Sequence, residues 1–360
     1  MPTIRAVGPV AGADEPAADA VAVTAGLPSR AVACVRLVSD PIDLVFGSPH
    51  TGLVEAVAAK FENHFRVIPT PGSRPDVACF IDPRIHERLV PTTRHPQIRL
   101  TEIGPPGRAE AIVVVHDGLQ RNLVAPAAGP AVVTAATRVL RAKAATALLR
   151  HGWVPIHASS VVGPGGRAVA LAGPRRVGKT SMLLTMLDLG AGSLLSNDTL
   201  FVRVEGDMLV GRSLPVSVGV RTDVLPMSPA LQSVVERGEH LHVDNEPPTP
   251  RPTDRVYLDA QELASLLNTR LARSAPIRSV VRVAFDCGMN GYSLDRISDP
   301  ASLIDETRLD ADQSWMADWL EPAAVPSTGL DILGSAEFYH LRYGADGSRW
   351  AAKALMEINQ

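Results

Sequence analysis

Four residues near the middle of the chain have the types and the spacing of a site that binds a phosphate chain. Gly173, Gly178, Lys179 and Thr180 satisfy the pattern G-x-x-x-x-G-K-[ST]. In this pattern glycines let the backbone N–H groups of a loop turn inward, the lysine reaches the β- and γ-phosphates, and the hydroxyl binds Mg²⁺. We therefore expect ATP and Mg²⁺ to bind at a segment that comprises Gly173, Pro174, Arg175, Arg176, Val177, Gly178, Lys179, Thr180 and Ser181.

The composition and the surroundings of this motif favour a functional site over a chance match. Because the chain has 28 glycines and few lysines, an accidental match is expected on the order of a few times in a thousand such chains. An apolar, strand-like run precedes the motif and a helix-forming run follows it, as phosphate binding at a helix start requires. Lys179 also supplies a compact point charge in a chain whose cations are mostly arginine.

Two polar groups flank the motif, and their order resembles a known family. His157 lies in the apolar run before the motif, and Asn197-Asp198 ends the first short strand after the motif helix. This arrangement is similar to the HPr serine kinase/phosphorylase family, which shares its fold with phosphoenolpyruvate carboxykinase. The resemblance covers roughly 137–210 and, more weakly, Phe338-Tyr339-His340-Leu341-Arg342 with the helix that follows.

The resemblance implies a fold, an activity and residue roles. It implies an α/β protein with a phosphoenolpyruvate carboxykinase-like P-loop kinase core and a mixed sheet, preceded by a small α/β domain. Asp198 matches an acidic residue that serves Mg²⁺ binding or substrate activation, and His157 matches the active-site histidine. With Lys179, these two residues are the expected catalytic groups, and Thr180 and Asp198 are the expected metal ligands.

The chain departs from the family at two places. Asn197 occupies the first position of the family's aspartate pair, and an amide does not accept a proton as a carboxylate does. The glycine-rich segment of the bifunctional enzyme has no counterpart downstream. The closer analogy is to HPr-kinase-like proteins that phosphorylate serine in peptides, including ribosomally made ones. A serine of a protein or peptide is the expected acceptor. A small-molecule acceptor and a non-catalytic nucleotide sensor remain open alternatives.

Several of these residues also have ordinary structural explanations. His157 fits a core histidine, Asp198 a turn cap, and Arg175 with Arg176 a solvated pair. Ser159 and Ser160 lack a G-x-S-x-G context and fit strand residues better than nucleophiles. Spacing alone does not place three further cations that are weak candidates for a phosphate or substrate contact, which are Arg221, Arg251 and Arg255.

The elements that must position the motif follow from hydrophobic periodicity. Residues 131–150 predict a helix, 156–162 and 168–172 two strands joined by a glycine turn, and 179–189 a helix closed by Gly190. A strand at 194–195, a hairpin at 200–210, a helix at 260–267, strands at 280–285 and 337–341 and a helix at 348–358 complete this part. Before it we expect strands at 31–38, 42–46, 65–68, 77–81 and 111–116 and a helix at 52–61.

These elements suggest three regions. Residues 1–28 form a disordered tail by composition, 29–130 a small N-terminal α/β domain, and 131–360 the P-loop kinase core with a proline-rich loop near 246–253. The tail lacks the basic start and apolar run of a secretory signal.

Charge and cysteine content exclude some function classes. The net charge of -3 and the lack of a basic cluster favour neither nucleic acid nor a membrane as partner. Three widely separated cysteines support neither a disulfide framework nor a zinc site. We therefore expect a cytoplasmic protein, and the sequence leaves a homo-oligomer open.

Overall fold

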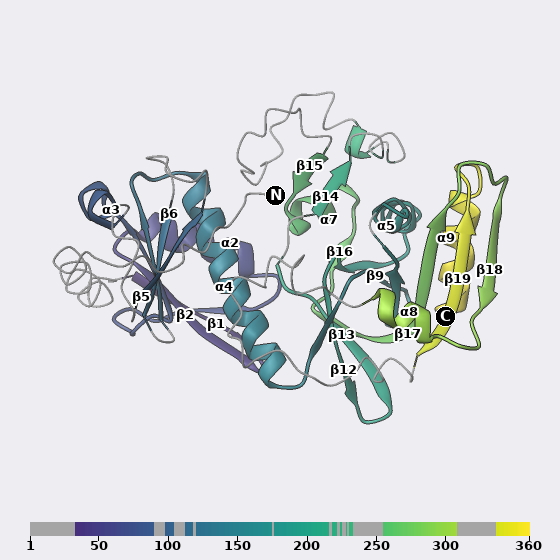
Figure 1. Ribbon diagram of the computed structural model, residues 1–360, viewed down its shortest axis with the longest axis horizontal. Helices are drawn as coiled ribbons and strands as arrows, with labels where there is room; N and C mark the ends of the chain where they lie inside the picture. The colour runs from purple at the N-terminus through teal and green to yellow at the C-terminus, as the bar shows by residue number, and fades with distance from the viewer. Residues whose placement is uncertain are drawn as a thin grey trace, which may run out of the picture. The chain divides into compact units, whose positions relative to one another are not determined.

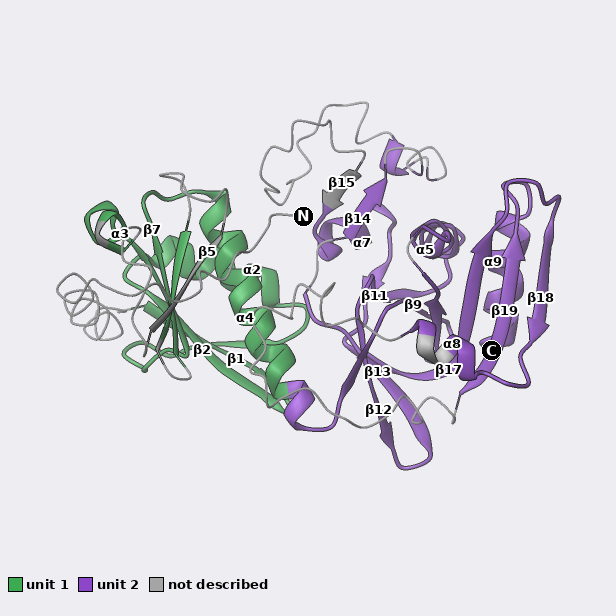
Figure 2. Cartoon of the chain, in the orientation of Figure 1, with its two compact units in different colours: residues 1–147, 244–252, 318–320 green, residues 148–243, 253–317, 321–360 purple. Residues whose placement is uncertain are grey.

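The computed structural model describes residues 33–89, 98–103, 112–117, 120–174, 176–215, 218–221, 224, 228, 230–232, 255–307 and 336–360. The expected tail at 1–28 and the proline-rich loop at 246–253 lie outside these residues. Two compact units divide the chain (Figure 2). Unit 1 takes the described residues up to Ala147, and unit 2 takes those from Leu148 onward.

Unit 1 is a mixed α/β layer built on one sheet. Its described strands have the order β3-β1-β2-β4-β7-β6-β5. β2, β4 and β7 are parallel to one another, and the other pairs are antiparallel. The elements are β1 (Ala33–Ser39), β2 (Ile42–Ser48), α2 (Thr51–Phe61), β3 (Arg66–Pro69), β4 (Val77–Ile81), α3 (Pro83–Leu89), β5 (Ile98–Ile103), β6 (Ile112–Asp117), β7 (Gln120–Ala125) and α4 (Pro130–Arg150), whose last turn crosses into unit 2.

Periodic burial explains why the predicted elements of unit 1 form. In α2 the buried positions Leu53, Val54, Val57 and Phe61 recur at helical spacing. The strands and helices expected in this region are confirmed with small differences at their ends, whereas α3, β5 and β7 were not predicted. The start of α3 is capped by Asp82, whose Oδ1 accepts hydrogen bonds from the backbone N–H groups of Arg84 at 3.1 Å and Ile85 at 3.0 Å.

Unit 2 contains a second mixed sheet. Its described strands run in the order β16-β11-β9-β10-β17-β13-β12-β8, β19 pairs with β17, and β18 pairs with β19. β10, β17 and β19 are parallel, and β9 is antiparallel to both β10 and β11. The strands are β8 (Val154–Ile156), β9 (Ala158–Val162), β10 (Ala168–Ala172), β11 (Ser193–Ser196), β12 (Leu200–Glu205), β13 (Met208–Arg212), β16 (Arg270–Leu271), β17 (Ser274–Phe285), β18 (Tyr292–Arg296) and β19 (Glu337–Tyr343).

Helices cover both faces of this sheet around the parallel strands (Figure 1). On one face α5 (Lys179–Asp188) and α9 (Ser348–Ile358) share a core with the strands, which includes Leu171, Leu183, Val283, Leu341 and Leu355. On the other face small alanines of β10 pack near Leu303 of α8 (Ala301–Glu306). A separate two-stranded sheet pairs β14 (Val218–Arg221) with β15 (Arg255–Leu258), and α7 (Ala260–Leu266) follows it.

Most of the predicted elements of unit 2 are confirmed, with one correction. The run expected as one strand at 156–162 is broken at His157, because β8 pairs with β12 whereas β9 pairs with β10 and β11. The chain therefore changes partners at His157. The molecule is a mixed α/β protein with mixed sheets. None of the described helices is both long and apolar enough to cross a membrane.

Candidate functional site

The glycine-rich loop at 173–178 joins β10 directly to α5 and uses backbone conformations that favour glycine. Gly173 has φ 131° and Gly178 has φ 97°, and Arg176 between them has φ 68°. A positive φ is rare for a residue with a side chain. Residues in this conformation cluster at active sites and in ligand-binding loops. Arg175 lies outside the described residues. The first turn of α5 has no side-chain cap and no acidic residue, which suits an anion at this helix start.

Two aromatic residues from distant strands hold this loop. The backbone N–H of Phe285 donates to the Val177 carbonyl at 3.0 Å, and the Tyr343 hydroxyl donates to the Gly178 carbonyl at 3.1 Å. The Tyr343 phenol is protonated near neutral pH, as donation requires, and burial raises its pKa further above the usual value. The Phe285 and Tyr343 rings meet edge to face with centroids 5.4 Å apart. The end of the sheet therefore fixes the junction between loop and helix.

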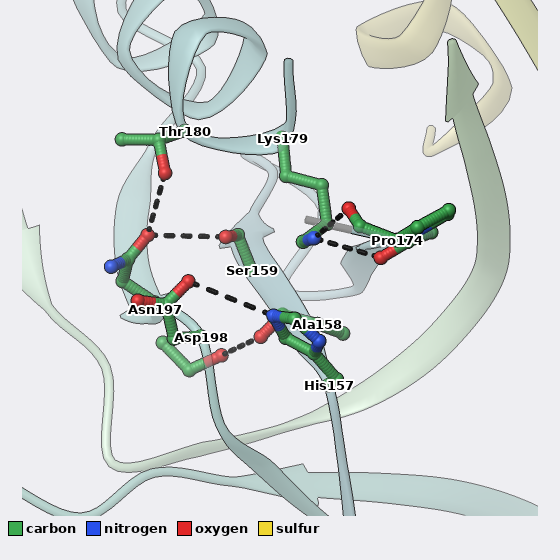
Figure 3. Close-up of polar contacts among 10 residues, drawn as sticks. His157, Ala158, Ser159, Pro174, Lys179, Thr180, Asn197 and Asp198 are labelled. Atoms are coloured by element: carbon green, nitrogen blue, oxygen red, sulfur yellow. Dashed lines mark hydrogen bonds and ion pairs between the residues drawn. The ribbon is translucent and has the colours of Figure 1, made fainter. Parts of the chain in front are cut away.

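Lys179 is buried at the start of α5, with 6% of its surface exposed. Its Nζ donates to the carbonyl oxygens of Gly173 and Pro174, each at 2.8 Å (Figure 3). A buried ammonium is stable only when such oxygens replace its water. The lysine thus lies against two carbonyls of its own loop, and a phosphate oxygen would be a stronger partner than either neutral carbonyl.

Thr180 and Asn197 connect α5 to the end of β11. The Thr180 hydroxyl lies 3.4 Å from Asn197 Oδ1, and the Ser159 hydroxyl donates to the same oxygen at 3.1 Å. Asn197 is only 3% exposed. An amide oxygen that accepts from two hydroxyls orients both of them, and it leaves the lone pairs of the Thr180 oxygen available. Ser159 was expected to be a plain strand residue, and it is also a partner of Asn197.

Asp198 and His157 complete the group. His157 Nε2 lies 3.9 Å from Asp198 Oδ1, and about half of the Asp198 side chain is exposed. Asp198 has φ 65°, a left-handed conformation that aspartate and asparagine adopt more often than most residues with a side chain. The backbone N–H of His157 donates to the Thr307 carbonyl at 2.8 Å, which fixes the histidine at the break between β8 and β9. Figure 3 shows Asp198 and His157 next to each other, below Asn197 and Ser159 in that view.

The structure therefore brings together Lys179, Thr180, Asn197, Asp198 and His157, which the sequence placed in three separate segments. Ser181 lies in the first turn of α5, where its carbonyl accepts from Thr185. Ser160 lies within β9, and its hydroxyl donates to the Val169 carbonyl, as expected for a strand residue. Arg221 and Arg255 are register partners in the β14–β15 sheet, and Arg251 lies outside the described residues.

Sequence reasoning missed Phe285 and Tyr343. Neither residue belongs to the motif, and their contacts with the loop cross a long stretch of sequence, 165 residues in the case of Tyr343 and Gly178. The sequence indicated these two residues only indirectly. Tyr343 follows the strand pattern Phe338 to Arg342, and the carboxyl ends of parallel strands in an α/β sheet are where ligand sites form.

The donor set can be tested against ATP and Mg²⁺. No cluster of three or more His, Cys, Asp or Glu side chains suited to a metal occurs in the described part of the chain. Thr180, Asn197 and Asp198 instead offer oxygen atoms, and Mg²⁺ takes few protein oxygens together with phosphate oxygens and water. The residues therefore fit Mg²⁺ that arrives with a triphosphate, and the uncapped start of α5 with Lys179 fits the phosphates.

Comparison with known proteins finds distant similarity in structure but none in sequence. No protein-family model matches the chain, and no curated protein is similar to it in sequence. Among solved structures, the HPr(Ser) kinase/phosphatase from Coxiella burnetii is similar, at 10% sequence identity, with a TM-score of 0.30. The match covers 56% of this chain and 93% of that chain. A likeness at this level does not identify the function, which must be inferred from the site.

Proposed function

We propose that this protein is an ATP-dependent kinase of the HPr-kinase-like, phosphoenolpyruvate carboxykinase-like type, which transfers the γ-phosphoryl group to a hydroxyl with Mg²⁺. The observation that carries the proposal is that Thr180, next to Lys179 at the start of α5, contacts Asn197, and that the following residue, Asp198, lies beside His157. A phosphate-binding helix start beside an accessible carboxylate is what phosphoryl transfer to a hydroxyl requires.

Each residue has a distinct role in this proposal. ATP with Mg²⁺ would supply the transferable phosphoryl group and offset part of its charge. Lys179 exchanges the Gly173 and Pro174 carbonyls for phosphate oxygens and stabilises negative charge there. Thr180, oriented by Asn197, turns its lone pairs to the metal. Asp198 accepts the proton of the acceptor hydroxyl, and His157, whose Nε2 lies 3.9 Å away, attracts that carboxylate when protonated.

The exposure of Asp198 supports a macromolecular acceptor. About half of this side chain is open to solvent, so a serine on a protein or peptide can approach it without a closed pocket. A small acceptor would need a more enclosed site to exclude water from the reacting groups. A serine of a protein or peptide is therefore the proposed acceptor.

Asn197 favours one rival function. Because a neutral amide occupies a position beside the Thr180 hydroxyl where a second carboxylate would strengthen metal binding, the site would also suit a protein that binds nucleotide without turning it over. In that rival, bound nucleotide organises a partner protein. The kinase is preferred because Asp198 and His157 still form a carboxylate–imidazole pair.

The test is transfer of label from γ-labelled ATP to serine-containing peptides, with alanine-substituted peptides as acceptor controls. Lys179→Ala should lower transfer on the order of 10²- to 10³-fold while the protein stays folded by circular dichroism. Lys60→Ala, on α2 of unit 1, is the matched control and should leave transfer unchanged. Binding of ATP without label transfer under every condition would favour the sensor, and phosphate release without a labelled acceptor would indicate an ATPase.

A further inference from the structure

A row of three aromatic residues crosses the sheet beside the glycine-rich loop. Phe285 of β17 is the register partner of Tyr343 of β19, and Tyr343 is in turn the register partner of Tyr292 of β18. Tyr343 is fully buried, whereas Phe285 is 44% exposed and Tyr292 is 41% exposed. In a chain with only 4% aromatic residues, Phe285 and Tyr292 are two large side chains exposed to solvent on either side of a buried tyrosine.

Phe285 borders the loop directly. Its N–H donates to the Val177 carbonyl at 3.0 Å, and a methyl group added at Gly178 would lie 3.2 Å from the Phe285 Cβ. The Phe285 ring is supported from one side by the edge-to-face contact with Tyr343, at an interplanar angle of 68°. The ring is therefore supported by Tyr343, and Phe285 lies beside Gly178, the residue before α5.

The order of strands in the sheet separates Phe285 from the polar groups of the site. β10, which leads into the loop, lies between β9 and β17, and β11 lies beyond β9. Asn197 and Asp198 follow β11, and His157 precedes β9, so all three lie on one side of the loop. Phe285 ends β17 and lies on the other side. A ligand that spans the start of α5 therefore meets carboxylate and imidazole at one end and an aromatic ring at the other.

If the proposed function holds, the placement of polar groups at one end and an aromatic ring at the other determines the direction in which a nucleotide binds. If Lys179, Thr180 and Asp198 act on the terminal phosphate, the phosphate chain runs from Asp198 across α5 toward β17, and the nucleoside emerges beside Phe285. We propose that the nucleobase stacks on the Phe285 ring, with Tyr343 as the buried support of that ring. Every base has a π-face, so stacking favours the larger purines over pyrimidines and discriminates little between adenine and guanine.

The test separates base binding from phosphate binding by calorimetry with Mg²⁺. ATP and inorganic tripolyphosphate are titrated into the full chain and into three variants. The unmodified protein should bind ATP more tightly than tripolyphosphate. Phe285→Leu, which keeps apolar bulk and loses the aromatic face, should raise the Kd for ATP about tenfold and leave the Kd for tripolyphosphate unchanged. Phe285→Trp should retain tight ATP binding.

Met208→Ala is the matched control, because Met208 is also an exposed apolar residue of unit 2, at 50% exposure, but lies on the β12–β13 hairpin. It should change neither Kd. An unchanged Kd for ATP in Phe285→Leu overturns the proposal. An equal rise for ATP and tripolyphosphate also overturns it, because Phe285 would then only shape the loop.

A failure of the base-stacking proposal can be distinguished from a failure of the proposed kinase activity. Base stacking is measured by binding and needs no acceptor. Nucleotide binding that depends on Phe285, without any phosphoryl transfer, would refute the kinase and keep the stacking site. Binding of neither ATP nor tripolyphosphate by the unmodified protein would refute both.

Discussion

Two helices that each follow a buried strand, α3 in unit 1 and α5 in unit 2, begin in different ways. The first turn of α3 is closed by the Asp82 carboxylate, which accepts from the N–H groups of Arg84 and Ile85. The first turn of α5 follows Gly178 and has no side-chain cap. An N-cap satisfies the orphan N–H groups of a helix from within. A helix start without a side-chain cap, next to a glycine-rich loop, is therefore suited to an external anion.

Two aspartates that follow strands, one in each unit, also differ in whether their carboxylates have hydrogen-bond donors within the protein. Asp82 follows β4 and its carboxylate is occupied by backbone donors. Asp198 follows β11, takes a left-handed conformation and lies half-exposed beside His157. The same residue type after a strand therefore serves structure in unit 1 and is available for chemistry in unit 2.

The largest expected effect comes from removing the Asp198 carboxylate. Asparagine tolerates a left-handed backbone, so Asp198→Asn should keep the fold within about 0.5 kcal/mol, as is usual for exposed positions. Loss of the proton acceptor should lower phosphoryl transfer by roughly 10²- to 10⁴-fold. Initial rates with labelled ATP and thermal unfolding measure the two quantities. Full activity in Asp198→Asn would mean that this carboxylate has no more chemical role than Asp82.

The second prediction compares a glycine with close neighbours, Gly178, with a glycine that has none, Gly72. Gly178 and Gly72 both have positive φ, but a methyl group at Gly178 would lie 2.4 Å from the Tyr343 hydroxyl, whereas nothing lies within 4 Å of one at Gly72. Gly72→Ala should cost about 1–2 kcal/mol of backbone strain. Gly178→Ala should cost more, and it should raise the Kd for ATP at least about tenfold because a displaced loop misplaces its phosphate contacts by tenths of an ångström or more. Urea unfolding and calorimetry test this; equal effects of the two substitutions would contradict it.

The smallest effect belongs to the cap of α3. Asp82→Ala should lower the free energy of unfolding by about 1 kcal/mol, because two N–H groups lose their acceptor. ATP affinity and phosphoryl transfer should stay unchanged, as both depend on unit 2. If Asp82→Ala weakened ATP binding as much as a change in the loop does, the division of roles between the two helix starts would be wrong.

The sequence could predict the part of the site that is local. The strand before the loop, α5 and the strand that ends at Asn197 follow from hydrophobic periodicity and from glycines at 173, 178 and 190, and all are confirmed. α3 carried a readable signal too, since Pro83 at its first position has a backbone suited to a helix start.

The rest depended on tertiary structure. β7 was missed because it begins with Gln120-Arg121-Asn122, which are polar but buried by the neighbouring strands. The break at His157 arises because β8 and β9 have different partners, which periodicity does not encode. Phe285 and Tyr343 reach the loop only through parallel pairing between β10, β17 and β19.

The bond between Tyr343 and Gly178 has a consequence for how the protein is made. Its two ends are separated by 165 residues, so the loop leaves the ribosome long before the strand that holds it. At typical rates of synthesis the delay is about 10 to 30 s. For most of that time β10 lacks β17, and for all of it β10 lacks β19, so the glycine-rich loop lacks one or both of its anchors. The ability to bind nucleotide should therefore be one of the last properties that a nascent chain acquires. Nucleotide binding by such a chain would indicate that β19 has joined the sheet.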